Sequence, residues 1–121
     1  MNQAALRLED SLDPRDLFAR VASRPGVAFL DGGPTRSILA WDPAGRLEID
    51  PLGRTLVGGA RRAGEPIAAL ARFLDDETRT GRTVIGALSY DLRTWIEPRA
   101  GRAPRTRRPL AVLHAYDRVQ T

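Results

Sequence analysis

The sequence predicts an α+β fold, a mainly antiparallel β-sandwich with one or two packed helices. Short apolar or alternating runs, bounded by glycine and proline, recur along the chain as expected for strands. Two of these runs, residues 27 to 31 and 36 to 42, are joined by only the four residues GGPT, so they should pair antiparallel. Strands and helices do not alternate regularly, which disfavours a doubly wound parallel sheet.

The first half of the chain is expected to hold one helix and four strands. In residues 11 to 22, Asp13 can cap a helix, Pro14 suits its first position and Asp16 lies near the positive end of its dipole. Strands are expected at 27 to 31, 36 to 42 and 46 to 50, with 53 to 57 after them. The glycine-rich residues 58 to 64 are expected to form a loop.

The second half opens with the clearest helical pattern of the chain. Apolar Ile67, Leu70, Ala71 and Leu74 follow each other at i, i+3, i+4 and i+7, and Gly81 should end the connection after this helix.

Two strands and an irregular loop follow. A strand is expected over residues 83 to 91, of which residues 84 to 90 are expected to form a central strand in which Gly86 allows close approach of a neighbour. Trp95 is expected to pack the short helix or turn of residues 92 to 97. After an irregular loop at 98 to 109, residues 110 to 119 are a strand that is apolar on both faces. Such a strand needs cover on both, from a second layer of this domain or from a partner.

Composition restricts the class of protein. A chain of 121 residues fits one domain, and without a stretch of about 18 apolar residues or an apolar leader it is expected to be soluble and cytoplasmic, with no membrane association. The absence of cysteine excludes disulfides, thiolate metal sites and a cysteine nucleophile. The net charge is +4, but all 19 basic residues are arginine and most are interleaved with acids, so nucleic-acid binding is disfavoured.

No segment carries a complete catalytic arrangement. The glycine-rich stretch 58 to 66 lacks the lysine of a phosphate loop, and the only histidine, His114, has no second ligand at metal spacing. The acids at 75 to 77 would point in different directions on a helix, and no serine has an independent base. The five arginines between 99 and 108 have no aromatic residue among them for stacking on bases. We expect no catalytic residue and no metal or cofactor in this chain.

The order of the segments resembles a known family. AFLDGGPTRSILAWDP is followed by the helix EPIAALARFLDD, then by IGALSYDLRTWIE, a polar loop and PLAVLHAYDRV. This order resembles the N-terminal domain of the chorismate-utilising enzymes, component I of anthranilate synthase and of aminodeoxychorismate synthase, over residues 13 to 119. The positions that match are Leu30, Ser37, Pro43, Gly86, Tyr90, Asp91, Glu97, Pro109, Tyr116 and Asp117.

The resemblance implies that residues 1 to 121 form a single N-terminal domain of such an enzyme. The short N-terminal segment and the FLDGG segment are more similar to the aminodeoxychorismate synthases of the family than to the anthranilate synthases. Some members bind tryptophan in this domain, which makes Leu30, Gly32, Arg36 and Ser37 a candidate amino-acid effector site. Gly32 replaces a serine common in the family, a change that removes one polar group from that site. Ala87 and Arg107 or Arg108 also depart from the family pattern.

The resemblance further implies a partner. In the family, chorismate and Mg²⁺ are bound by a C-terminal catalytic domain, in cis or in trans, and ammonia comes from a glutamine amidotransferase subunit. The sequence ends before that region, so this chain alone is expected to be inactive. Two alternatives stay open: a stand-alone amino-acid-binding module without catalysis, and a basic nucleic-acid-binding domain.

Overall fold

The computed structural model describes residues 13 to 30, 37 to 97 and 107 to 119. Within these residues the chain forms a two-stranded and a five-stranded antiparallel sheet together with two α-helices and a 3₁₀ helix. The predicted α+β class with antiparallel strands is confirmed. No helix in the described ranges is long and apolar enough to cross a bilayer.

The N-terminal elements form a small unit that we call the hairpin lobe. It consists of α1 (Pro14–Val21), β1 (Ala28–Leu30) and β2 (Ile38–Ala40), and the two strands pair antiparallel as predicted. The Asp13 carboxylate caps α1 by accepting a hydrogen bond from the Arg15 N–H at 2.8 Å. The lobe has a core of its own, made by the buried side chains of Leu17, Val21, Leu39 and Trp41.

The five-stranded sheet has the strand order β5-β4-β3-β7-β6. Its strands are β3 (Gly45–Ile49), β4 (Thr55–Val57), β5 (Ala60–Arg62), β6 (Thr83–Leu88) and β7 (Ala111–Tyr116), and each neighbouring pair is antiparallel. The strand β7, which comes late in the sequence, lies between β3 and β6. The centre of the sheet therefore joins segments that are far apart along the chain.

The expectation of a loop at residues 58 to 64 is wrong for part of that stretch. Gly58 and Gly59 have φ angles of 59° and 82°, and Val57 pairs with Ala60. Two consecutive residues with positive φ form the tight turn that suits the twist of a β-hairpin, and glycine adopts this conformation without steric cost. The glycine pair thus makes a two-residue turn, and the chain returns as β5.

A strand does form in residues 83 to 88, but the expectation that residues 84 to 90 form a central strand is wrong. β6 is an edge strand, because its one partner among the strands of this sheet is β7. The apolar run that suggested burial on both sides is compatible with an edge, since composition does not report which strands flank it. The predicted role of Gly86 is confirmed: a Cβ placed there would lie 2.1 Å from the carbonyl oxygen of Val112.

The helix α2 (Pro66–Arg79) covers one face of the sheet. It is the helix that the apolar spacing predicts, and its N-terminus is capped by Glu65, which accepts hydrogen bonds from Ile67 N and Ala68 N at 2.9 Å each. The acidic residues 75 to 77 belong to the helix, and Gly81, with φ of 86°, follows its end. The core beneath α2 consists of Leu47, Ile49, Phe73, Leu92, Leu110, Ala111, Leu113 and Ala115.

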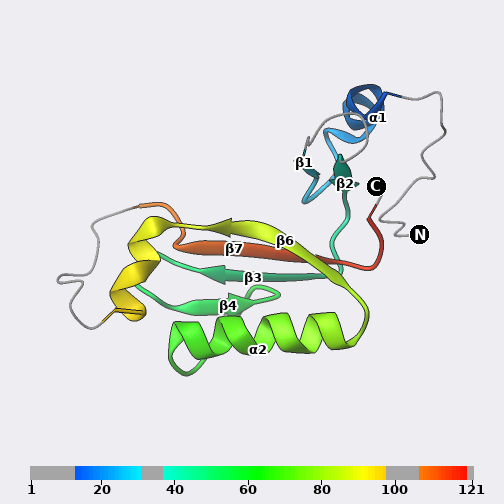
Figure 1. Ribbon diagram of the computed structural model, residues 1–121. Helices are drawn as coiled ribbons and strands as arrows, with labels where there is room; N and C mark the ends of the chain where they lie inside the picture. The colour runs from blue at the N-terminus through cyan, green and yellow to red at the C-terminus, as the bar shows by residue number, and fades with distance from the viewer. Residues whose placement is uncertain (1–12, 31–36, 98–106, 120–121) are drawn as a thin grey trace.

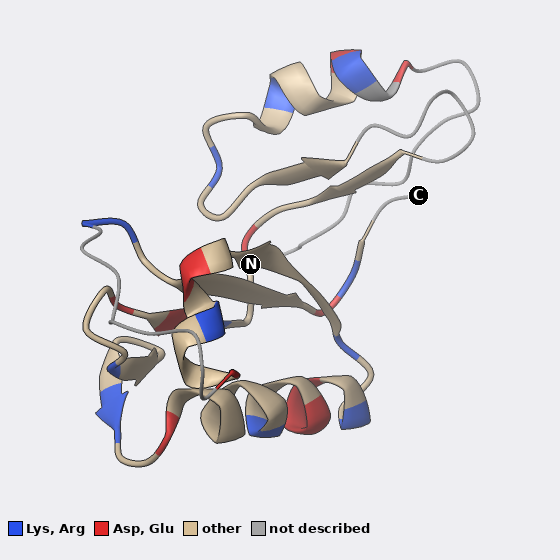
Figure 2. Ribbon diagram, turned by 60° about the vertical axis from the view of Figure 1, so that its left-hand side comes forward, with Lys and Arg blue, Asp and Glu red and all other residues tan. Residues whose placement is uncertain are grey.

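The elements are stacked in layers. In Figures 1 and 2 the five-stranded sheet lies between α2 on one side and the hairpin lobe on the other. The lobe contacts the sheet through Tyr116, which is fully buried and whose hydroxyl donates a hydrogen bond to the Gly26 carbonyl oxygen. β7 is therefore covered by α2 on one face and by the lobe at the Tyr116 end of the other.

Candidate functional site

The structure places two of the four predicted effector residues. Leu30 ends β1 and is 50 % exposed, and it pairs across the hairpin with Ile38. Ser37, next to Ile38, is buried. Gly32 and Arg36 lie outside the described residues. The hairpin thus places Leu30 and Ser37 on either side of the connection between its two strands.

The sheet has a second face, opposite α2, that we call the open face. Since Leu47 and Ile49 point into the core under α2, the alternation of strand side chains turns their neighbours to this other side. The strand register then aligns Ile85, His114 and Arg46 in one row across the sheet, and Ala87, Val112 and Glu48 in the next. All six of these residues lie on the open face.

Charged and apolar groups are mixed on the open face. Arg46 and Glu48 form an ion pair with 2.7 Å between the guanidinium and carboxylate atoms. Both side chains are partly exposed, so this pair contributes little to stability. Beside them, Val112 and Ile85 are half-buried and Ala87 is exposed. The open face therefore combines one ion pair with three apolar side chains.

The surroundings of His114 on the open face change its protonation. Partial burial, assisted by the nearby Arg46 guanidinium, lowers the pKa of His114 from its ordinary 6.5. The imidazole packs near Gly26, where a Cβ would lie 3.7 Å from the ring, and near the Tyr116 ring at 6.2 Å between centroids. Among the described residues, no carboxylate or hydroxyl group hydrogen-bonds to it.

The lowered pKa makes a testable prediction about stability. The folded state binds the proton of His114 less readily than the unfolded state, so the stabilising contribution is present above pH 6.5 and is lost as the pH falls through the folded pKa. The free energy of unfolding should therefore decrease between about pH 7.5 and about pH 5, and less so in a His114→Gln variant.

Proton NMR of this single histidine measures the pKa directly. In an Arg46→Gln variant the pKa should move toward 6.5, because one positive neighbour is removed. A folded-state pKa at or above 6.5 in the wild type would contradict the burial of this ring.

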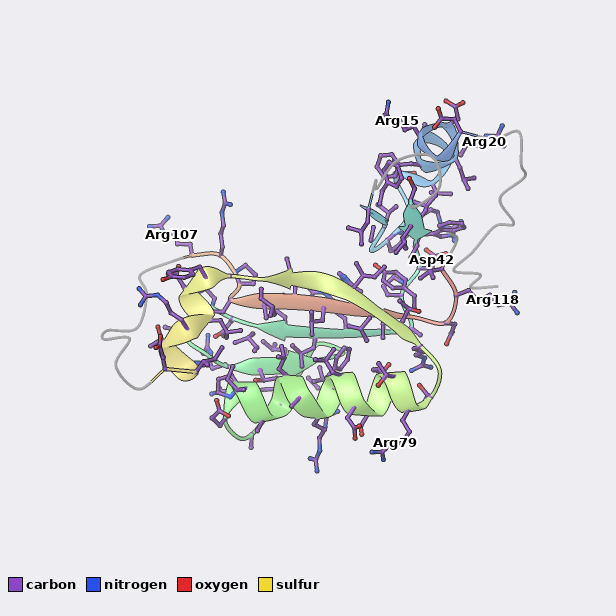
Figure 3. The ribbon with its side chains drawn as sticks, in the orientation of Figure 1. Arg15, Arg20, Asp42, Arg79, Arg107 and Arg118 are labelled. Carbon is purple, nitrogen blue, oxygen red and sulfur yellow. The ribbon has the colours of Figure 1, made fainter. Side chains whose placement is uncertain are left out.

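The junction between the hairpin lobe and the sheet is held by polar contacts at Asp42. Figure 3 shows Asp42 where the chain passes from the lobe to the sheet. Its φ is 52°, a left-handed conformation that aspartate tolerates better than most residues, and its N–H donates to the Pro25 carbonyl oxygen at 2.9 Å. The Arg24 guanidinium forms an ion pair with its carboxylate. The polar groups of Asp42 are thus used to fix the direction of the chain.

A shallow depression of about 380 Å³ lies at the other end of the sheet, lined by Gly53, Glu65, Pro66 and Trp95. Trp95, near the C-terminus of η1 (Tyr90–Trp95), packs against Gly53, whose added Cβ would fall 2.3 Å from the indole ring. The predicted packing role of Trp95 is confirmed by its contact with the core. Both carboxylate oxygens of Glu65 accept hydrogen bonds from the start of α2, so the depression offers no uncommitted acid.

Two further ionic groups, around Arg82 and around Asp50, support the fold. Arg82 bridges Asp117 at 2.9 Å and Glu77 at 2.8 Å, and these hydrogen bonds raise the pKa of the guanidinium. Burial would raise the pKa of Asp50, but hydrogen bonds from Arg54 and from the Leu52 N–H outweigh it and hold that pKa below 3.8. Among the described residues, no group of three or more His, Asp or Glu side chains could hold a metal ion.

Sequence reasoning missed the features that connect distant segments. The Tyr116–Gly26 bond, the Gly53–Trp95 contact and the pairing of Arg46 with His114 each join residues more than 40 positions apart. No local pattern marks such pairs. Comparison with known proteins adds no further information, because no family model, curated protein or solved structure matches this chain.

Proposed function

We propose that this chain is the N-terminal domain of a cytoplasmic chorismate-utilising enzyme similar to component I of aminodeoxychorismate synthase. The intact enzyme would convert chorismate and ammonia, supplied from glutamine by an amidotransferase subunit, to 4-amino-4-deoxychorismate for folate synthesis. A C-terminal catalytic domain would bind chorismate and Mg²⁺. The share of this chain would be a scaffold for that domain.

The observation that carries the proposal is the order of the resembling segments along the chain. The FLDGGPTRSILAW segment overlaps the β1 and β2 hairpin, EPIAALARFLDD opens α2, IGALSYDLRTW spans most of β6 and all of η1, and PLAVLHAY leads into and includes β7. Each segment thus overlaps one or two elements of the described fold. A scaffold role also agrees with the open face, which mixes apolar and paired charged groups and has no acid–base pair among the described residues.

The proposal is tested first with the coding sequence that follows the codon of Thr121. A continuous frame of roughly three hundred further residues is expected, since a catalytic domain of this class needs that length. The extended protein should consume chorismate in the presence of ammonium and Mg²⁺, whereas residues 1 to 121 alone should not. Formation of anthranilate, which is fluorescent, would assign the protein to the sibling branch. An extended protein that leaves chorismate unchanged would contradict the proposal.

An independent amino-acid-binding module is the second candidate, because the hairpin lobe has a hydrophobic core separate from that of the sheet. Thermal unfolding with millimolar tryptophan separates the two. A ligand that binds the folded state raises the midpoint of unfolding. A shift that is lost in a Ser37→Ala variant, together with an inactive extended protein, would favour the module; the absence of any shift would exclude tryptophan as its ligand.

A further inference from the structure

The two edges of the five-stranded sheet differ in how they are protected. Edge strands expose unpaired backbone groups, and proteins commonly shield them with charged residues or by keeping them short. β5 follows this rule, because it has three residues of which Arg61 and Arg62 are charged. β6 does not follow it. Residues 83 to 90, TVIGALSY, contain neither a charge nor a proline.

The outer side of β6 is accessible. Gly86, Ala87 and Leu88 are exposed, and Leu88 retains 56 % of its accessible surface. The Ser89 N–H donates to the Leu110 carbonyl oxygen at 2.7 Å, so Ser89 directs its backbone groups toward the segment of β7. Because these directions alternate in an antiparallel ladder, Val84, Gly86 and Leu88 direct theirs outward.

This edge is complementary to itself. When two copies meet antiparallel with Gly86 opposite Gly86, the three outward-directed residues of one strand face those of the other, and Val84 comes opposite Leu88 at both ends. On the open face the same register places Ile85 opposite Ala87. No like charges meet, because the paired stretch has none. Apolar cross-strand pairs of this kind stabilise antiparallel sheets.

We propose that β6 pairs with β6 of a second copy of this chain about a two-fold axis at Gly86, which joins the two five-stranded sheets into one. The interface is isologous, since each copy contributes the same residues. It satisfies the outward backbone groups and gives the exposed Leu88 side chain an apolar partner. The inference goes beyond the proposed function and holds for any activity of the protein.

The mass of the protein in solution tests the pairing. Analytical ultracentrifugation of the wild type, from low to high micromolar concentration, should show a species of twice the 13.3 kDa of one chain. A Leu88→Lys variant should weaken the dimer by about tenfold or more, because it removes two apolar pairs and adds two charges to the interface. Leu52→Lys is the matched control: Leu52 is 70 % exposed and lies outside β6, so this variant should dimerise like the wild type.

Cross-linking tests the register without disturbing Leu88. The chain has no cysteine, so Ala87→Cys introduces a single thiol into β6. In the proposed register the two thiols lie two residue steps and one strand spacing apart, about 8 Å between Cα atoms. A short bismaleimide should join them, and it should not join two copies of a Leu52→Cys control.

Three results would overturn the proposal: a wild type that stays monomeric throughout, a dimer that Leu88→Lys leaves unchanged, or equal cross-linking of Ala87→Cys and Leu52→Cys. If the wild type is monomeric, the partner of the β6 edge would have to be a different polypeptide. None of these outcomes depends on chorismate chemistry, so failure of the pairing is distinguishable from failure of the proposed function.

Discussion

Replacement of Leu47 by alanine is expected to lower the free energy of unfolding by about 2–5 kcal/mol. Leu47 is completely buried in β3, where it pairs with Leu113 of β7 and with Val57 of β4. Removing its branched end leaves a cavity in the core between the sheet and α2, which the surrounding strands can fill only in part. A loss of this size is a large share of the 5–15 kcal/mol that holds a typical domain folded.

Urea denaturation followed by circular dichroism measures this loss as a lower midpoint with an unchanged slope. Leu52→Ala is the matched control, because it makes the same chemical change at a leucine that is 70 % exposed. The control should alter the free energy by no more than about 0.5 kcal/mol. Equal effects at the two positions would show that the core under α2 is not packed as described.

Gly86→Ala is expected to destabilise the protein by about 3 kcal/mol, the upper range for overpacked sites. The new Cβ would lie 2.1 Å from the Val112 carbonyl oxygen and 2.7 Å from the Leu113 Cα. Both are backbone atoms of β7, so relief requires β6 and β7 to move apart and to weaken the hydrogen bonds between them. The effect is steric, since the φ of Gly86 is not in the left-handed region.

Gly45→Ala provides the comparison within the same sheet. The nearest atom to its new Cβ is Oε1 of Glu77 at 2.9 Å, the far end of a flexible side chain that can shift by a few tenths of an ångström together with its ion-pair partner Arg82. Thermal unfolding should therefore show a much smaller decrease in midpoint for Gly45→Ala than for Gly86→Ala. The reverse order would mean that β6 does not approach β7 as closely as the structure has it.

Local patterns predicted most elements of this fold. The spacing of Ile67, Leu70 and Leu74 gave α2, the capping pair Asp13 and Pro14 gave α1, and the short GGPT connection gave the β1 and β2 hairpin. In each case the residues that make up the pattern lie within or directly beside the element that they predict, in a short stretch of sequence. Hydrophobic periodicity and capping are properties of such short windows, which explains why they were readable.

Strand order could not be read in this way. β6 is rich in β-forming residues whether it lies at the centre or at the edge, and its position depends on β7, which begins 23 residues after β6 ends. The turn at Gly58 and Gly59 was readable in principle, because two glycines between short runs favour a hairpin. Of the candidate effector site, Leu30 and Ser37 are placed by the hairpin, while Gly32 and Arg36 lie outside the described residues.

The position of β7 between β3 and β6 has a consequence for synthesis on the ribosome. Residues 45 to 49 and 83 to 88 emerge well before residues 111 to 116, and they have no ladder with each other. Until β7 has left the exit tunnel, the nascent chain carries two strands, β3 and β6, that both lack their common partner. Such delayed long-range pairing makes folding slow. In the meantime the unpaired strand edges are accessible to chaperones and can aggregate with neighbouring chains.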